Sequence, residues 1–280
     1  MERINKKILA LHFSNRAESY DRAAFLQREI AYQLVERSFP DPTSASCRDI
    51  LELGCGTGFL TRFLLERLDP ENLVALDLAC GMIERARESL NGSRDTARFL
   101  LADCERPPLA PGSFDLAASS TTLQWLDSME DTLREIHTLL RPGGRFVFAT
   151  LGQETFRELR RAYRTAAGQM GIRLAAGRYG PSLPGPHEVR RMLENAGFRE
   201  ITVDSVSKTE FFPCCRDFLH SIKDRGANNP NFRPMSLAVE RALMRRVIEY
   251  YDRSFKVDGR VYAGYEVIYA EAWKAGEETK

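Results

Sequence analysis

The sequence predicts an α/β protein in which helices cover both faces of a mostly parallel sheet. Short apolar runs of strand length alternate with segments whose apolar residues recur at helical spacing, and the loops between them are short. Three glycines at alternate positions, Gly54, Gly56 and Gly58, follow the first of these runs and lead into a helical segment. Strands that alternate with helices, with a glycine-rich loop after the first strand, are typical of a doubly wound sheet.

The first half of the chain carries the regular part of this alternation. Residues 4–38 are predicted to be helical with an interruption, and Asp41-Pro42-Thr43-Ser44 indicates a linker. We expect strands at 49–53, 73–78, 97–101, 114–119 and 145–151. We expect helices at 60–67, 81–90 and 127–140, and a turn at residues 141–144 before the last of these strands.

The second half is less regular. We expect, in order, a helix at 154–170, the loop GRYGPSLPGP at 177–186, a helix at 187–196 that ends at Gly197, a strand at 199–209, a helix at 237–251 and a strand at 261–273. The sheet therefore resumes after residue 197, with additional helical material near 154–185 and 213–256. Insertions on a regular scaffold commonly carry specificity, so we expect substrate selection there.

Composition and charge narrow the function classes. The formal net charge of the 280 residues is +1, which does not favour nucleic acid or a membrane surface as the partner. The second half, residues 151–280, is basic, with 22 Lys and Arg against 17 Asp and Glu, which is compatible with an acidic partner or an ordinary solvated surface. No signal-peptide core or bilayer-length apolar run is present, and six scattered cysteines without a CxxC pair indicate reduced thiols, so we expect a cytoplasmic protein. The four histidines are dispersed, so we expect no metal.

The loop LELGCGTG and three acids near it indicate the ligand. The spacing Gly54-x-Gly56-x-Gly58 differs from the dinucleotide fingerprint, and no Gly-Lys-Ser/Thr of a phosphate-binding loop follows. Asp77, 19 residues after Gly58 at the end of the second strand, is placed to take ribose hydroxyls. Glu52 ends the first strand, and Asp103 follows the third, placed to accept from an adenine amino group. Three acids without a basic residue to meet a pyrophosphate predict a ligand that has adenosine but no phosphates.

Several ordered stretches over residues 50–150 resemble the class I S-adenosylmethionine-dependent methyltransferases: ILELGCGTG, VALDLACGMIERAR, ADCERPPL, FDLAASS and LLRPGGRFVFAT. The resemblance implies a Rossmann-like fold with a mostly parallel seven-stranded sheet and helical insertions, and S-adenosylmethionine as the cofactor. It implies an N-terminal helical cover at 1–45 and a methyltransferase domain at 46–280, together one structural unit. The cofactor contacts it implies are Gly54, Gly56 and Gly58 beside the methionine, Asp77 at the ribose, Met82 against the adenine, and Asp103 with Cys104 at the adenine edge, together with Glu52, Leu78 and Ser119.

Stretches that flank these motifs are similar to the malonyl-acyl-carrier-protein O-methyltransferases of biotin synthesis. They are HFSNRAESYDRAAFLQREIA at 12–31, TTLQWLDSMEDTLREI at 121–136, TLGQETFRELRRAY at 150–163, IKDRGANN at 222–229 and YEVIYAEAWK at 265–274. The loop GRYGPSLPGP matches that family poorly, and Ser120 stands where its members often have Asn. The resemblance implies methyl transfer to the free carboxyl of a malonyl group on acyl carrier protein. Methylation would remove the negative charge of the malonyl carboxylate, so that the enzymes of fatty-acid elongation would accept the carrier-bound acyl group as a biotin precursor.

The chemistry of this methyl transfer determines which kinds of residue the substrate-binding part of the site requires. A carboxylate is already ionised at neutral pH, so no general base and no catalytic proton acceptor are needed. The site has to orient the carboxylate and exclude water, and our candidates for the substrate contact are Tyr20, Gln124, Trp125 and Arg178. A stripe of Arg157, Arg160, Arg161 and Arg164 on one side of the helix at 154–170 is either a solvated face or a contact for the acidic carrier.

Two other functions remain open from the sequence. A methyltransferase for another small carboxylic acid such as trans-aconitate has a similar Leu-Gln-Trp stretch. A cofactor-binding assembly factor without methyl transfer would keep the same glycine loop and Asp77. We expect a monomer that acts on the malonyl carrier protein and binds neither nucleic acid nor membrane.

Overall fold

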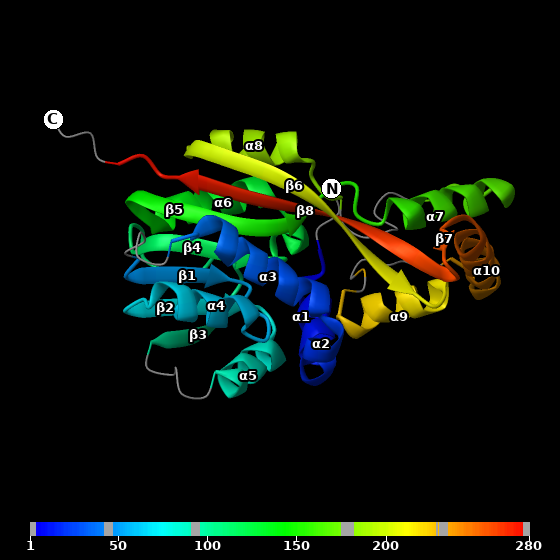
Figure 1. Cartoon of the computed structure of the whole chain (residues 1–280), viewed down its shortest axis with the longest axis horizontal. Coiled ribbons are helices and arrows are strands. Elements are labelled where there is room, and N and C mark those ends of the chain that lie inside the picture. The colour runs from blue at the N-terminus through cyan, green and yellow to red at the C-terminus, as the bar shows by residue number, and fades with distance from the viewer. Residues whose placement is uncertain are drawn as a thin grey trace.

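The computed structural model describes residues 4–41, 47–90, 96–174, 182–227, 229 and 235–276. Its centre is a sheet with the strand order β3-β2-β1-β4-β5-β8-β6 (Figure 1). The strands are β1 (Asp49–Leu53), β2 (Asn72–Asp77), β3 (Ala97–Leu101), β4 (Phe114–Ser120), β5 (Leu140–Leu151), β6 (Arg199–Phe212) and β8 (Arg260–Trp273). Strands β1 to β5 pair in parallel, β8 runs antiparallel to β5 and β6, and the two-residue β7 (Lys256–Val257) pairs with β8. The predicted mostly parallel sheet of seven strands is confirmed for the described residues, with β7 as a short addition.

Helices cover both faces of the sheet because successive strand residues point to opposite sides. In β1, Ile50 packs in a cluster with the buried residues of α3 (Phe25–Ser38), α4 (Phe59–Leu68) and α5 (Cys80–Ser89). Its neighbour Leu51 packs in the other cluster, with α6 (Met129–Leu139) and α8 (Pro186–Asn195). The expected alternation of strands and helices in the first half is confirmed, and the sheet positions the loops at its carboxyl edge.

The N-terminal segment consists of three helices. The predicted interrupted helix is α1 (Lys6–Ser14), α2 (Ala17–Ala23) and α3, with breaks after Ser14 and at Ala24. Helix α3 packs on the sheet, whereas α1 and α2 pack against α5. These two helices therefore lie over the carboxyl end of the parallel strands, where Figure 1 shows them in dark blue.

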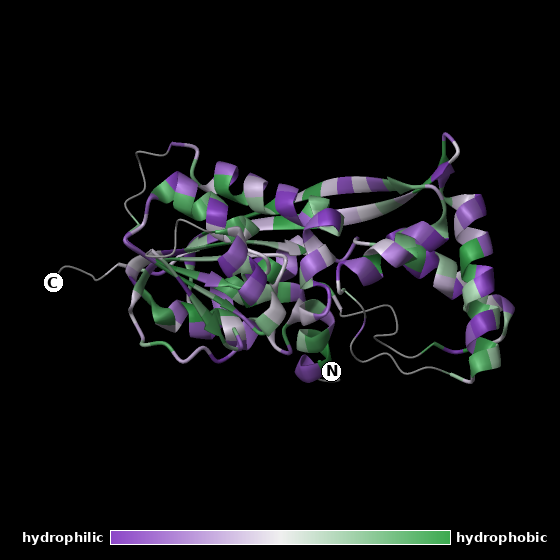
Figure 2. Cartoon of the chain, turned by 90° about the horizontal axis from the view of Figure 1, so that it is seen from below, coloured by the Kyte–Doolittle hydropathy of each residue, from purple (hydrophilic) through white to green (hydrophobic). Residues whose placement is uncertain are grey.

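The second half of the chain extends the molecule beyond the sheet. Strands β6 and β8 form a long antiparallel pair that runs from the sheet to α10 at the other end of the molecule (Figures 1 and 2). Helices α7 (Arg157–Gln169), α9 (Cys215–Asp224) and α10 (Leu237–Ser254) pack around it and confirm helical material in both insertions. Strands β6 and β8 are both longer than predicted. The turn predicted at 141–144 lies inside β5, where Gly143 has a φ of +76°. None of the helices in the described ranges is long and apolar enough to cross a membrane.

Candidate active site

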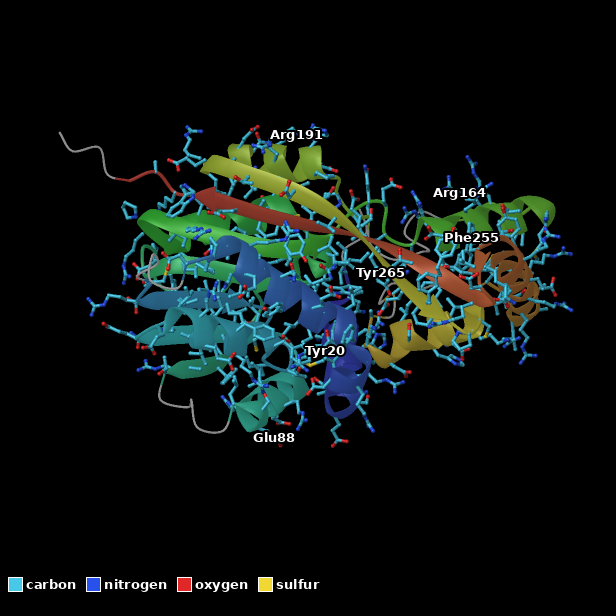
Figure 3. All side chains as sticks on the ribbon, viewed as in Figure 1. Tyr20, Glu88, Arg164, Arg191, Phe255 and Tyr265 are labelled. Carbon is cyan, nitrogen blue, oxygen red and sulfur yellow. The ribbon has the colours of Figure 1, made fainter. Side chains whose placement is uncertain are left out.

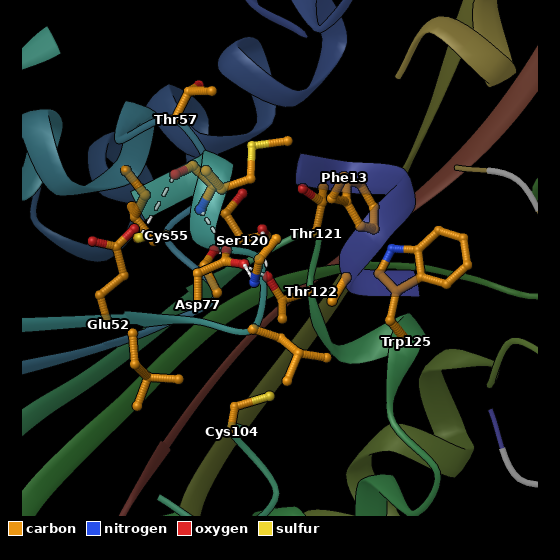
Figure 4. Close-up of a pocket in the computed structure, with 18 of the residues that line it drawn as sticks. Phe13, Glu52, Cys55, Thr57, Asp77, Cys104, Ser120, Thr121, Thr122 and Trp125 are labelled. Atoms are coloured by element: carbon orange, nitrogen blue, oxygen red, sulfur yellow. Dashed lines mark hydrogen bonds between the residues drawn. The ribbon is translucent and has the colours of Figure 1, made fainter. Parts of the chain in front are cut away.

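A cavity lies at the carboxyl ends of β1, β2 and β4 and beneath α1 and α2. Glu52 and Cys55 lie toward one end, Asp77 lies near the middle, and Phe13 and Trp125 lie toward the other end (Figure 4). Strand β1 has β2 on one side and β4 on the other, so the cavity lies at the switch point where open α/β sheets bind ligands.

The glycine loop after β1 forms one wall of this cavity. Gly54 has a φ of +72°, and a Cβ atom there would lie 2.1 Å from Oγ1 of Thr122. Gly56 also has positive φ, and nothing lies within 4 Å of the place where its Cβ would stand, so its backbone faces the open cavity. Gly58 packs against α5 and is not one of the residues that line the cavity. Two of the three glycines are thus placed for ligand contact.

Asp77 connects the glycine loop to the start of α5. Its Oδ2 accepts a hydrogen bond from the backbone N–H of Gly56 at 2.9 Å, and its Oδ1 accepts one from Ala79 at 2.8 Å. Burial raises the pKa of this carboxyl, against the opposing effect of the backbone N–H groups. Carboxylate oxygens accept more than one hydrogen bond each, so Asp77 retains the capacity to receive the two ribose hydroxyls expected there.

Glu52 presents an unpaired charge-bearing atom to the cavity. The residue is fully buried, its Oε2 accepts from the Thr61 hydroxyl at 2.6 Å, and its Oε1 has no partner among the residues that the structure describes. Burial, together with the charge of Asp77, raises the pKa of Glu52 to about 8. A buried carboxylate oxygen without a donor is costly, so this position is suited to a cationic ligand group such as an ammonium.

Three more cavity residues have buried polar atoms without a partner in the described part of the chain. They are Thr57 (Oγ1), Ser120 (Oγ) and Gln27 (Oε1). With Glu52 they come from the glycine loop and from β1, β4 and α3. Buried polar atoms in folded proteins are generally paired, so a cluster of exceptions around one cavity indicates a polar ligand.

The segment that follows β2 and the loop after β3 carry the residues predicted for the adenine. Leu78, Met82, Asp103 and Cys104 all line the cavity. Met82 is also core, because it packs with Ala17 and with the aromatic rings of the N-terminal helices. Burial raises the pKa of Cys104 to about 12, so its thiol stays neutral.

Lys6, which the sequence analysis missed, closes this part of the cavity from α1. Its ammonium forms ion pairs with Asp103 and Glu105, and Asp103 also accepts from the backbone N–H of Glu105 at 3.0 Å. Burial opposes the charge on Lys6, but the two carboxylates outweigh it and raise its pKa. Asp103 is therefore already engaged, and its remaining acceptor capacity is what an adenine amino group would use. No motif in the sequence marks Lys6, since its reach depends on how α1 docks.

Aromatic side chains from two distant segments line the opposite end. The ring of Phe13 lies 6.5 Å from that of Tyr20 and 5.8 Å from that of Trp125, in both cases edge to face. Burial, together with the negative charge of Asp77, raises the pKa of Tyr20, so its phenol stays protonated. Phe13 was not predicted as a site residue, although it lies in the stretch HFSNRAESY that carried the family resemblance. We call Phe13, Tyr20 and Trp125 the aromatic wall.

Besides Gly58, two predicted site residues in the described part of the chain do not line the cavity. Ser119 is buried and donates to the backbone carbonyl of Leu53 at 2.9 Å, which joins β4 to β1. Gln124 donates to the carbonyl of Thr121 at 2.7 Å and accepts from the Thr150 hydroxyl at 3.1 Å. Neither is among the lining residues. Arg178 lies outside the described residues. Within the described ranges, no group of three or more His, Cys, Asp or Glu side chains could hold a metal ion.

Comparisons with known proteins identify the class and the family of the chain. A family described as "Methyltransferase domain" matches residues 51–148. The malonyl-[acyl-carrier protein] O-methyltransferase of Acetivibrio thermocellus is 35% identical over 277 residues, which cover 97% of this chain and 95% of that protein. The enzyme of the same name from Halorhodospira halophila is also 35% identical, over 98% of this chain and 89% of its own.

Solved structures share the fold at low sequence identity. A putative methyltransferase from Bacillus halodurans superimposes with a TM-score of 0.60 at 17% identity, covering 88% of this chain and 98% of its own. Phosphoethanolamine N-methyltransferase 2 from Haemonchus contortus, solved in complex with S-adenosyl-L-methionine, has a TM-score of 0.58 at 15% identity, covering 94% of this chain and 57% of that one.

The sheet order, the glycine loop and the acid-lined cavity define a class I methyltransferase, for which S-adenosylmethionine is the methyl donor. Within that class, 35% identity over nearly the whole length of the chain shows that it belongs to the malonyl-[acyl-carrier protein] O-methyltransferase family. Both predictions from the sequence, the class and the family, are confirmed.

The residues present fit this cofactor. The unpaired Oε1 of Glu52 would accept a hydrogen bond from the ammonium of the cofactor's methionine part, beside the open space at Gly56. Asp77 would hold the ribose, and Leu78 and Met82 would border the adenine. The cofactor, when bound, supplies an electrophilic methyl group on a sulfonium.

Proposed function

We propose that this protein transfers a methyl group from S-adenosylmethionine to the free carboxyl of malonyl-acyl carrier protein, which gives the malonyl methyl ester at the start of biotin synthesis. It acts as a monomer in the cytoplasm. The observation that carries the proposal is the 35% identity, over nearly the whole chain, to proteins whose names specify this reaction. The aligned region covers 97% of the chain and so spans the insertions, and function on a shared fold depends on the sites grafted onto it.

The reaction does not require the protein to accept or donate a proton. The acceptor carboxyl is ionised at neutral pH, and its oxygen forms the new bond to the methyl carbon as the carbon–sulfur bond breaks. The anion and the cation are both neutralised, and no proton is released. The lining of the cavity, with carboxylates at one end and aromatic rings at the other, matches a site that positions reactants rather than one that moves protons.

The chain's residues then have separate tasks. Glu52 and Asp77 fix the cofactor, and the α1–α2 cover with the aromatic wall keeps water from the reacting atoms. Holding two reactants in line is worth roughly 7–11 kcal/mol of the barrier in well-oriented systems. We propose Tyr20 and Trp125 for the acceptor side, because both line the cavity and both pack against Phe13. Gln124 acts indirectly, through Thr121.

The acidic carrier protein needs a basic surface. Arg157, Arg161 and Arg164 are exposed on one side of α7, whereas Arg160 turns back to the carbonyls of Gln153 and Thr155 and does not belong to that surface. Helix α10 packs against α7 and adds exposed residues of the same charge, Arg241 and Arg245. We propose that these two helices receive the carrier.

Intact mass spectrometry tests the reaction. Malonyl-acyl carrier protein incubated with the protein and S-adenosylmethionine should gain one methyl group, which an esterase for carboxyl methyl esters removes. Acetyl-acyl carrier protein, which has no free carboxyl, is the control and should gain none. If the malonyl carrier is unchanged while cofactor binding is confirmed by calorimetry, the proposal is wrong. Methylation of free trans-aconitate would then indicate a small-acid methyltransferase, and cofactor binding with no product would indicate an assembly factor.

A further inference from the structure

Three segments that distinguish this chain from a general methyltransferase meet at one turn. The turn, Arg225-Gly226, follows α9 and belongs to the stretch IKDRGANN. It contacts Tyr265 in the stretch YEVIYAEAWK and the N-terminal stretch that contains Phe13 and Tyr20. Figure 3 shows Tyr20 and Tyr265 in the middle of the molecule, between the sheet and the α7–α10 end.

Arg225 is buried, with 6% of its surface exposed, and all three guanidinium nitrogens donate. One donates to Oε1 of Glu210 at 2.8 Å, one to the Tyr265 hydroxyl at 2.9 Å, and Nε to the carbonyl of Ala23 at 2.7 Å. The Tyr265 hydroxyl in turn donates to Oε2 of Glu210. Because Glu210 matches its charge and each of its three nitrogens already donates a hydrogen bond, we assign Arg225 to internal contacts and not to a substrate carboxylate. Its contact with Ala23 holds the end of α2, the helix that carries Tyr20.

Gly226 continues this link to the aromatic wall. It has a φ of +68°, and a Cβ atom there would lie 3.0 Å from Cδ1 of Phe13 and 3.3 Å from the carbonyl of His12. Phe13 packs edge to face against both Tyr20 and Trp125. The position of Phe13 is thus set by a turn that belongs to the insertion after β6.

We propose that Arg225 and Gly226 are positioning residues for methyl transfer, which hold α2 and Phe13 so that the aromatic wall faces the acceptor correctly. This inference rests on the proposed methyl transfer for its kinetic consequence. The link also gives the substrate-side insertion a direct mechanical connection to the reacting end of the cavity.

Two glycine variants separate this role from general backbone strain. Gly226→Ala places a methyl group against Phe13, whereas Gly259→Ala introduces alanine at a φ of +79° with nothing within 4 Å of the new Cβ. Both variants strain the backbone, but only the first touches the wall. The protein has two tryptophans, Trp125 and Trp273, and Trp273 pairs with Arg145 and Arg199 at the far end of β8. In a Trp273→Phe background, fluorescence therefore reports Trp125 alone.

We expect Gly226→Ala to shift the Trp125 emission and to lower the turnover of malonyl-acyl carrier protein about tenfold, because small displacements of a positioning group have large kinetic effects. Gly259→Ala should do neither. Equal effects of the two variants, or an unchanged Trp125 emission in Gly226→Ala, would overturn the proposal.

Arg225→Lys provides a second variant. Lysine keeps a cation beside Glu210 but lacks the fork that also reaches Ala23, so we expect a smaller emission shift and a turnover between those of wild type and Gly226→Ala. Wild-type emission and turnover in Arg225→Lys would contradict the role of Arg225. The emission measurement needs no substrate, so it tests the positioning role even if the wild-type protein proves inactive on the malonyl carrier. That inactivity would count against the proposed function alone.

Discussion

Glu52 combines full burial with an unpaired carboxylate oxygen, so its ionisation should govern cofactor binding. Its pKa of about 8 means that the free protein holds it mainly protonated at neutral pH, and only the ionised form pairs fully with an ammonium. We expect the affinity for S-adenosylmethionine to rise as pH is raised from 6.5 through about 8. Glu52→Gln should weaken binding about 10- to 100-fold and remove that pH dependence, since hydrogen bonds to charged groups are worth roughly 1.5–3 kcal/mol. Calorimetry at several pH values measures both effects, and a pH-independent wild-type affinity would contradict the assignment.

The same carboxyl makes a separate prediction for stability without cofactor. Unfolded glutamate has a pKa near 4.3, below the folded value of about 8. Between these pH values the folded state keeps a proton that the unfolded state has lost. Glu52 therefore lowers the free energy of unfolding as pH rises, by at most about 1.4 kcal/mol per pH unit, and adds no further loss above the folded pKa. Denaturant titrations from pH 5 to 8 should show a flatter profile for Glu52→Gln than for wild type. The exposed Glu88→Gln is the control and should keep the wild-type slope.

Gln124 should act through the backbone and not through the substrate. Thr121, whose carbonyl accepts from Gln124, has a φ of +55°, which is unfavourable for a β-branched residue. Gln124→Leu leaves that carbonyl and the Thr150 hydroxyl without this partner, so we expect a loss of about 1–3 kcal/mol in the free energy of unfolding and a lower kcat. A direct substrate contact would instead raise KM and leave stability unchanged. Denaturant titration and steady-state kinetics on the same variant distinguish the two.

Among the secondary-structure elements, α1 is attached at two points, to the loop after β3 and to the start of α5. Lys6 pairs with Asp103 and Glu105, and the hydroxyl of Ser14 accepts from the backbone N–H of Gly81 at 3.3 Å. Lys6→Met removes the first attachment. Because the pair is partly exposed, we expect only about two- to fivefold faster cofactor dissociation. Stopped-flow displacement measures the rate, and Lys7→Met, an exposed lysine on the same helix, should leave it unchanged.

The elements also show what periodicity could and could not predict. Apolar spacing predicted the strands and helices of the first half, because burial on a sheet leaves a period that the sequence carries directly. The ends of strands placed Glu52, Asp77 and Asp103 at one edge. Spacing could not predict that the side chains of Ser119 and Gln124 donate to backbone carbonyls. The direction of a side chain depends on its rotamer and its tertiary surroundings, which the neighbouring residues in the sequence do not determine. Lys6 and Phe13 reach the cavity only through the docking of α1, which is a tertiary contact.

At the scale of the whole molecule, the cofactor cavity lies at the sheet, whereas the surface that we propose for the carrier lies on α7 and α10 at the other end. The sheet and its glycine loop could belong to many methyltransferases, whereas β6 and β8 extend beyond the sheet to where α7, α9 and α10 pack around them. The Arg225 turn then connects that extension back to the cavity. A fold of this kind can change its acceptor by changing the extension while the cofactor site stays constant.

The positive charge on α7 and α10 should affect the methylation of malonyl-acyl carrier protein and leave that of malonyl-coenzyme A unchanged. Reversing Arg164 on α7 together with Arg245 on α10 removes two exposed cations that would meet an acidic carrier. We expect kcat/KM for malonyl-acyl carrier protein to fall at least tenfold at low salt, mainly through KM, while turnover of malonyl-coenzyme A changes less than twofold. The wild-type rate with the carrier should also fall as salt is raised from 50 to 300 mM, because screening weakens steering between exposed charges. Arg98→Glu on β3, the strand at the opposite edge of the sheet from β6, is the matched control and should behave as wild type. An equal loss with both substrates would mean that the substitutions disturb the cavity, and no loss with the carrier would place its docking surface elsewhere on the molecule.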